Sequence, residues 1–266
     1  MSDSTPDQVL PAHSLEGKRA LITGSSRGIG ADTARYLAAA GARVIVNYRN
    51  KEARALKVVQ SIEDAGGTAV AIGADLTDPV SVEDMFQGIR DDWGGLDILV
   101  LNASGGMESG MGEDYALRLN RDAQVNVLES ALPLLGPGSR VVFVTSHQAH
   151  FIETVPTMPE YEPVARSKRA GEDALRDRLP ARATLPRLEQ AGIEFVVVSG
   201  DMIEGTITAT LLERARPGAI DARRESAGRL YSVSEFAAEV AKAVVEPVPE
   251  DHTRYVGDIS GFVSGG

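Results

Sequence analysis

The segment from Thr23 to Gly30, with the sequence TGSSRGIG, has the residue types and spacing that bind a phosphate group. Its glycines permit a tight turn, and a helix that begins beside them would point free N–H groups and its positive dipole end at a phosphate. The alternative is an ordinary strand-to-helix turn, but an apolar strand-like run precedes it and a helical pattern follows. We predict that a dinucleotide contacts Thr23, Gly24, Ser26, Arg27, Gly28, Ile29 and Gly30.

The end of the second predicted strand, at Tyr48, Arg49 and Asn50, lacks the Asp or Glu that usually binds the ribose 2′-hydroxyl of NAD. Arg27 and Arg49 could instead clamp a 2′-phosphate, which suits a planar guanidinium. Each arginine alone would be read as a solvated surface charge, but the pair beside a missing acid favours NADPH. Residues that follow the third and fourth predicted strands extend the cofactor site: Asp75, Leu76, Asn102, Ala103 and Ser104.

These residues resemble the short-chain dehydrogenase/reductase family in order and rough spacing. The resemblance runs from Lys18 nearly to the C-terminus and includes the glycine turn, Asp75, Asn102, Asn120, Ser146 and Lys168. It implies an oxidoreductase whose cofactor-binding fold is also its whole catalytic domain. It also implies a homodimer or homotetramer.

The resemblance assigns Asn120, Ser146 and Lys168 to the catalytic site, with Lys168 also holding the nicotinamide ribose. It places Gly200 and Met202 beside the cofactor. In the family a Tyr stands four residues before the Lys and acts as general acid, its pKa lowered from about 10 by the Lys. Here Val164 occupies that position, and valine cannot donate a proton. The chain therefore departs from the family that it resembles at the proton donor.

Tyr161 is one candidate replacement, because it lies seven residues, or two helical turns, before Lys168. Pro163 favours the first helical position, which would make Glu162 the cap and leave Tyr161 in the preceding loop, free to bend back into the site. The alternative for Tyr161 is packing or substrate contact. His147 is a second candidate acid and His150 a third, although strand alternation should turn His147 away from Ser146.

Another reading is that the reaction needs no strong acid. Hydride transfer to a carbonyl develops alkoxide charge, whereas transfer to an iminium neutralises a charge already present. The stretch Ser146 to Lys168, together with Ser199 to Met202, resembles an actinobacterial branch of the family associated with reducing hemiaminals of alkaloid-like antibiotics. Three hypotheses remain open: an iminium, hemiaminal or activated-carbonyl reductase; a carbonyl reductase that uses Tyr161; and a non-catalytic NADPH sensor. Candidate cation stabilisers for the first are Glu108, Glu160 and Asp201.

The elements that must position these residues follow a repeated strand–helix pattern, which predicts a doubly wound parallel sheet of about seven strands. Predicted strands occupy residues 19–23, 43–47, 68–73, 98–102, 140–145 and 194–199, with a last strand near 253–256. Predicted helices occupy 28–40, 51–65, 80–92, 115–135 and 163–179. We expect one Rossmann-type domain over 17–266, a flexible leader over 1–16 and a mobile substrate lid over 201–231.

The composition limits the possible functions. The 266 residues carry a net charge of -11 and no cysteine, which argues against a nucleic-acid surface and excludes disulfides and thiolate chemistry. We expect no metal site, because no obvious carboxylate set accompanies the histidines. No apolar run approaches the roughly 20 residues of a membrane helix, so we expect a cytoplasmic protein acting on a small molecule.

Overall fold

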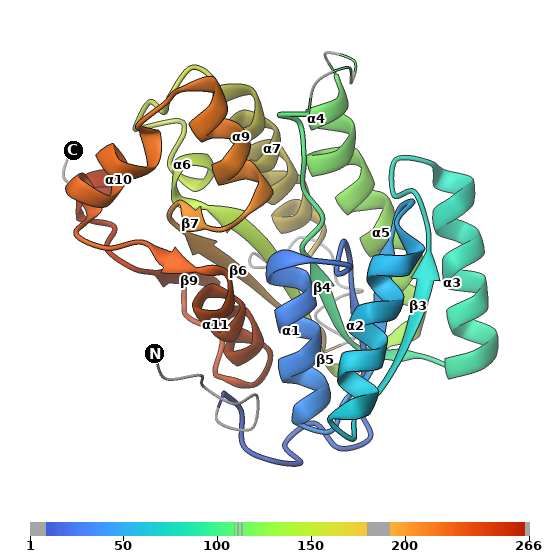
Figure 1. Ribbon diagram of the computed structural model, residues 1–266. Coiled ribbons are helices and arrows are strands. Elements are labelled where there is room, and N and C mark those ends of the chain that lie inside the picture. Colours follow the sequence, from blue (N-terminus) through green and yellow to red (C-terminus); the bar gives the residue numbers. More distant parts are fainter. Residues whose placement is uncertain (1–8, 109, 111, 113, 180–191, 264–266) are drawn as a thin grey trace.

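A seven-stranded parallel sheet forms the centre of the computed structural model, which describes residues 9–263 except 109, 111, 113 and 180–191 (Figure 1). The strand order is β3-β2-β1-β4-β5-β6-β9, so the winding direction reverses between β1 and β4. The strands are β1 (Arg19–Ile22), β2 (Arg43–Tyr48), β3 (Thr68–Gly73), β4 (Leu96–Leu101), β5 (Leu135–Ser146), β6 (Glu194–Gly200) and β9 (Thr253–Val256). This architecture confirms the predicted single Rossmann-type α/β domain.

Helices cover both faces of this sheet, which explains why its strands are apolar on both sides. On one face α1, α2 and α11 pack in one core cluster, and on the other α3, α5 and α7 pack in a second. The longer helices are α1 (Gly28–Ala39), α2 (Glu52–Asp64), α3 (Pro79–Trp93), α5 (Ala123–Ala131), α7 (Glu162–Arg178) and α11 (Val233–Val245). Leu21 and Leu99 are fully buried on the face of the second cluster, and Ile22 and Val100 are fully buried on the face of the first.

A third, smaller core lies beyond the carboxyl end of the sheet. It joins the segment after β5 to α9 (Ile207–Ala215) and α10 (Ala219–Ala227), which lie together at this end in Figure 1. A short parallel pair, β7 (Ile203–Glu204) with β8 (Tyr231–Ser232), closes the same region. The segment 201–231, predicted as a lid, therefore contains two helices and two short strands.

The segment predicted as a helix over 115–135 is helical from 115 to 134, but it is not a regular α-helix throughout. The structure has α4 (Tyr115–Leu117), a π-helical turn (Arg118–Asp122), α5 and a 3₁₀ turn (Leu132–Leu134). Pro133 lies inside the 3₁₀ turn, as expected of a residue that cannot donate to a helix ladder. The π turn packs against α7, where Gly171 lies close to the Asn120 carbonyl oxygen.

The predicted flexible leader also needs correction where the structure describes it. Leu10 and Leu15 are buried in the first core, and the Leu15 N–H donates to the Ala40 carbonyl at 2.9 Å. Residues 9–16 are thus packed against the end of α1, because these two leucines bury apolar surface there. The first eight residues of the predicted leader lie outside the described residues.

Within the described part of the chain, no helix combines the length and apolarity needed to cross a membrane. The same residues contain no group of three or more acidic or histidine side chains arranged to hold a metal ion.

Candidate active site

The glycine turn joins β1 to α1 at the carboxyl edge of the sheet. Gly24 and Gly28 have φ of 62° and 59°, a region that favours glycine. A Cβ on Gly30 would lie 2.6 Å from the Asn102 amide nitrogen, so only glycine allows this close approach. The Thr23 hydroxyl donates to the Val100 carbonyl and accepts from the Asn102 N–H at 2.9 Å, which fastens β1 to β4.

The N-terminus of α1 offers a place for an anion. Its cap residue, Arg27, makes no side-chain hydrogen bond to the first turn, so N–H groups there remain available to a ligand. This helix end opens on a cavity of about 460 Å³ that runs from the glycine turn to α7 and α9. The turn, the uncapped helix end and the cavity fit a bound pyrophosphate.

Cationic side chains line the end of this cavity that lies next to the glycine turn and the end of β2. Arg27 and Arg49 are exposed and line it, as do Lys51 and Arg54, which the sequence analysis did not select. Arg49 Nη1 donates to the Tyr115 hydroxyl at 2.6 Å. These positive charges fit the predicted 2′-phosphate end of a dinucleotide.

Tyr161 folds back onto Ser146. Its hydroxyl lies 3.1 Å from Ser146 Oγ, and both side chains are buried in the cavity wall. Tyr161 is the cap residue of α7. The cap predicted from Pro163 was Glu162, so the helix begins one residue earlier than predicted. Burial raises the pKa of Tyr161, only partly opposed by the hydrogen bond with Ser146, so its phenol stays protonated at neutral pH.

Lys168 lines the same cavity from α7, and burial lowers its pKa to about 8. Among the described residues its amine has no hydrogen bond or ion pair, which suits a group that holds a ligand. Val164 lies one turn earlier, is 3% exposed and also lines the cavity. The surface at the usual tyrosine position is therefore apolar.

Asn120 lies in the π turn and outside the cavity wall. Its amide donates to the Gly105 carbonyl at 2.8 Å and to Ser167 Oγ at 2.9 Å, and accepts from the Gly105 N–H. A Cβ on Gly171 of α7 would lie 2.0 Å from the Asn120 carbonyl oxygen. Asn120 thus links the loop after β4 to the helix that carries Lys168.

The two histidines near Ser146 point away from the cavity. His147 is fully buried, with Nδ1 2.8 Å from Ser199 Oγ and Nε2 3.2 Å from the Val256 carbonyl. Burial lowers its pKa to about 4, so it is neutral near pH 7. His150 contacts Glu172 and Tyr255. These contacts give both imidazoles structural roles and leave neither beside Ser146 and Tyr161.

The three acids considered as cation stabilisers have different surroundings. Asp201 lines the cavity, but Arg223 binds both of its oxygens at 2.7 to 3.0 Å, which offsets its charge. Glu108 also lines the cavity and accepts from the Gly106 N–H at 2.6 Å. Glu160 faces Arg216 at 3.7 Å and is not among the cavity-lining residues. Glu108 is the acid best placed to meet a cation.

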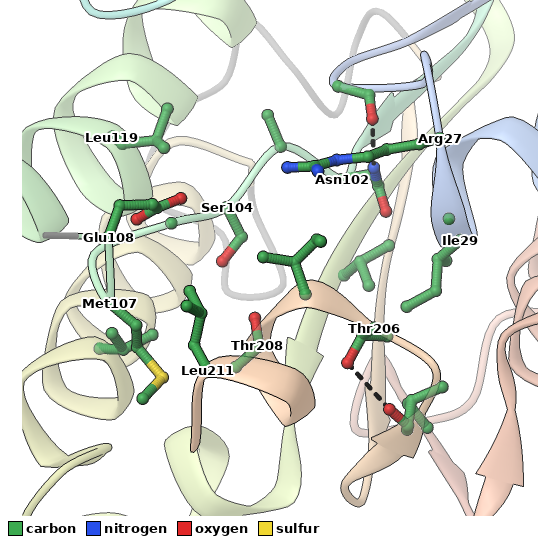
Figure 2. Close-up of a pocket in the computed structure, with 18 of the residues that line it drawn as sticks. Arg27, Ile29, Asn102, Ser104, Met107, Glu108, Leu119, Thr206, Thr208 and Leu211 are labelled. Carbon is green, nitrogen blue, oxygen red and sulfur yellow. Dashed lines mark hydrogen bonds between the residues drawn. The ribbon is translucent and has the colours of Figure 1, made fainter. Parts of the chain in front are cut away.

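The opposite wall of the cavity comes from α9, which lies in the segment predicted as a substrate lid, although no residue of this helix was selected individually. Figure 2 shows Thr206, Thr208 and Leu211 facing Asn102 and Ser104 across the cavity. Thr206 is the cap residue of α9, where its hydroxyl accepts from the Ala209 N–H at 3.2 Å. A Thr before an apolar run is a helix-start signal, which was available in the sequence but carries no indication of the cavity.

Most predicted site residues meet at this cavity. Those that line it are Gly24, Ser26, Arg27, Gly28, Ile29, Tyr48, Arg49, Asn50, Asp75, Leu76, Asn102, Ala103, Ser104, Ser146, Tyr161, Lys168 and Met202. Those that do not line it are Thr23, Gly30, Asn120, His147 and Gly200. Gly200 serves packing, since a Cβ there would lie 2.3 Å from the Phe236 ring.

Comparison with known proteins gives this geometry a context. The family model described as short chain dehydrogenase matches residues 18–173. A hydroxynaphthalene reductase-like protein from Metarhizium majus is 38% identical over 177 residues, covering 64% of this chain and 62% of the relative. The chain thus spans less than two thirds of that relative's length. A short chain dehydrogenase from Emericella nidulans is 30% identical over 249 residues, covering 91% of this chain and 88% of the relative.

Among solved structures, the angucycline C-6 ketoreductase LanV with bound NADP is similar over most of the chain. It is 27% identical with a TM-score of 0.70, and the match covers 91% of this chain and 94% of that chain. The bound NADP belongs to that structure.

Proposed function

The chain belongs to the short chain dehydrogenase family, and from that premise we propose that it is an NADPH-dependent reductase of a ring ketone. The names of similar proteins support this choice, since one is a ketoreductase with bound NADP and another a hydroxynaphthalene reductase-like protein. The substrate end of the cavity supports it too. Its lining there is largely apolar and includes Met107, Met158, Val164, Met202 and Leu211. Methionines adapt to flat or irregular ligands.

The residues present fit the proposed cofactor. Gly28 has open space where a Cβ would lie, which leaves room for a close-lying pyrophosphate, whereas Gly24 and Gly30 let the turn pack closely against Ala103 and Asn102. Arg27 and Arg49 supply charge for a 2′-phosphate. Lys168 has a free amine for ribose hydroxyls. NADPH, when bound, would supply the hydride.

The hydrogen bond between Ser146 and Tyr161 is the observation that carries the proposal. A ketone oxygen becomes an alkoxide as it is reduced and requires a donor. The Tyr161 phenol keeps its proton at neutral pH and would give it to this oxygen, while the Ser146 hydroxyl would donate to the phenol oxygen, orient it and stabilise the phenolate left behind. Lys168 would add positive charge nearby. Tyr161 would thus replace the tyrosine missing at Val164.

The test is Tyr161→Phe, which removes one oxygen from the cavity wall. We expect kcat for a bicyclic ketone such as tetralone to fall by about 10² to 10⁴, the usual contribution of a general acid. Binding of NADPH, followed by its fluorescence, should change little. Tyr255→Phe is the matched control, because its hydroxyl contacts His150 outside the cavity and its loss should leave turnover intact. Full activity of Tyr161→Phe would refute the role of Tyr161.

A second candidate function is reduction of an iminium or hemiaminal, as in the actinobacterial branch that the sequence resembles. The apolar Val164 surface favours it, because such a reaction needs no acid at that position. Glu108 would then stabilise the cation. Dihydroisoquinoline has the same bicyclic skeleton as tetralone and distinguishes the two. If the enzyme reduces the imine but not the ketone, and Tyr161→Phe keeps that activity, the second function replaces the first.

A further inference from the structure

Tyr115 and Arg49 form a contact at the cofactor end of the cavity that joins distant parts of the chain. Arg49 follows β2, whereas Tyr115 is the first residue of α4. The guanidinium donates to the Tyr115 hydroxyl at 2.6 Å and its carbon lies 5.9 Å from the ring centroid. Both residues line the cavity. The contact therefore belongs to the ligand site and is not a surface pairing elsewhere.

The side chains of Tyr115 and Arg49 differ greatly in conformational freedom. Tyr115 is 4% exposed and is part of the core on the α3 and α5 face, so its ring is fixed. Arg49 is exposed, and a free arginine side chain carries substantial rotamer entropy that a ligand must remove. The fixed phenol thus restrains the mobile guanidinium before any ligand arrives.

The charges around Tyr115 favour this arrangement. Burial is the largest influence and raises its pKa, Arg49 lowers it, and Glu108 and Asp75 raise it. The phenol is therefore neutral and can accept from Arg49 at physiological pH. An arginine has five N–H donors, and the bond to Tyr115 uses one, which leaves the rest of the planar fork for an anion.

We propose that Tyr115 is a positioning residue that sets the preference for the phosphorylated dinucleotide, by holding Arg49 where it meets the 2′-phosphate. This inference rests on the proposed NADPH dependence and deepens it. Tyr115 acts through Arg49, so its effect should disappear when Arg49 is removed and should not reach ligands that lack the 2′-phosphate.

The experiment measures dissociation constants of NADPH and NADH for the full-length protein, for Tyr115→Phe, for Arg49→Ala and for the double variant. Tyr115→Phe keeps the buried ring and removes only the hydroxyl. We expect it to weaken NADPH binding about fivefold and to leave NADH binding within about twofold, as for loss of one hydrogen bond to a charged group. Arg49→Ala should weaken NADPH binding about tenfold or more. The double variant should match Arg49→Ala.

The outcomes separate this inference from the proposed function. If the unaltered protein does not prefer NADPH to NADH, the cofactor proposal fails. If it prefers NADPH and Arg49→Ala abolishes the preference, but Tyr115→Phe keeps it in full, only the role of Tyr115 fails. A gain in NADPH affinity in Tyr115→Phe would also overturn the inference, since the phenol would then compete with the phosphate. An equal loss for NADPH and NADH would indicate general damage to the site and likewise reject it.

Discussion

Lys168 carries a charge that changes within an accessible pH range. Burial lowers its pKa from 10.5 to about 8, so the amine is protonated near pH 7 and loses its charge as the pH rises through about 8. The protonated amine would stabilise the developing alkoxide, so we expect kcat/KM for ketone reduction to fall above about pH 8. The pKa of Tyr161 is raised instead, so its phenol stays protonated over the same range. A pH–rate profile measures this descending limb.

Two variants test whether Lys168 causes this fall of kcat/KM above about pH 8. Lys168→Met removes the titrating group, so its residual activity should be lower and should lack the limb near pH 8. Tyr161→Phe should be slower, but its limb should remain at the position of the unaltered protein. A limb near pH 8 that persists in Lys168→Met would assign the titration to another group and contradict the role given to Lys168.

For individual residues, the sequence predicted well which side chains line the cavity. It predicted less well which groups each side chain contacts. Pro163 indicates that Tyr161 precedes the helix, yet its approach to Ser146 depends on how the segment after β5 packs. Asp201 had been considered as a cation stabiliser, but its charge is offset by Arg223, which lies 22 residues away in the chain. Such a pairing across a loop leaves no local pattern.

At the scale of elements, the contact between α7 and the π turn fixes the relative positions of Lys168 and Asn120. Gly171→Ala would place a Cβ 2.0 Å from the Asn120 carbonyl oxygen, so one of the two elements must move. We expect the free energy of unfolding to fall by about 1 to 3 kcal/mol, as for overpacking of a core, and kcat to fall as Lys168 shifts. Chemical denaturation and steady-state kinetics measure the two effects.

Gly88→Ala is the matched control for this substitution. Gly88 lies in α3, and nothing stands within 4 Å of the position of its Cβ. Alanine favours a helix over glycine by about 1 kcal/mol, so this variant should be at least as stable as the unaltered protein and fully active. If Gly171→Ala were equally harmless, the close approach of the two elements would not hold the π turn.

This contact also explains where the prediction of elements succeeded and failed. The strands were found from short apolar runs, because each is buried on both faces and its pattern is local. The helical segment over 115–135 was also predicted, but the π turn within it was not. The π turn inside it coincides with the glycine of a helix some 50 residues later, and a local pattern does not contain that glycine.

At the scale of the whole molecule, the two sheet faces and the α9–α10 region have separate cores. The third core is the smallest and is tied to the sheet by a polar link. Asp201, directly after β6, is 7% exposed and accepts from Arg223 of α10, from Gln148 and from the Met202 N–H. Small cores with few buried contacts open first in native-state hydrogen exchange. The lid predicted over 201–231 can be tested as such a unit.

Arg223→Gln should loosen this unit and leave the sheet intact. The substitution leaves the buried Asp201 carboxylate without its bidentate partner, which destabilises the closed position of α10. Arg223 also stacks over Phe262, at 5.0 Å, so the C-terminal segment would lose a contact too. We expect amides of α9 and α10 to exchange about tenfold faster, while those of β1, β4 and β5 keep their protection.

The neighbouring Arg224→Gln is the control. It also removes one charge from α10, but it does not break the bond to the buried Asp201, so it tests whether loss of that bond causes the faster exchange. Arg224 pairs with Glu204 and Asp221, but all three side chains are exposed, and exposed ion pairs contribute about 0 to 1 kcal/mol. Its exchange rates should stay close to those of the unaltered protein. Equal acceleration in both variants would show that α10 is held by general electrostatics. Acceleration that extends into β5 in Arg223→Gln would show that the third core does not open independently of the sheet.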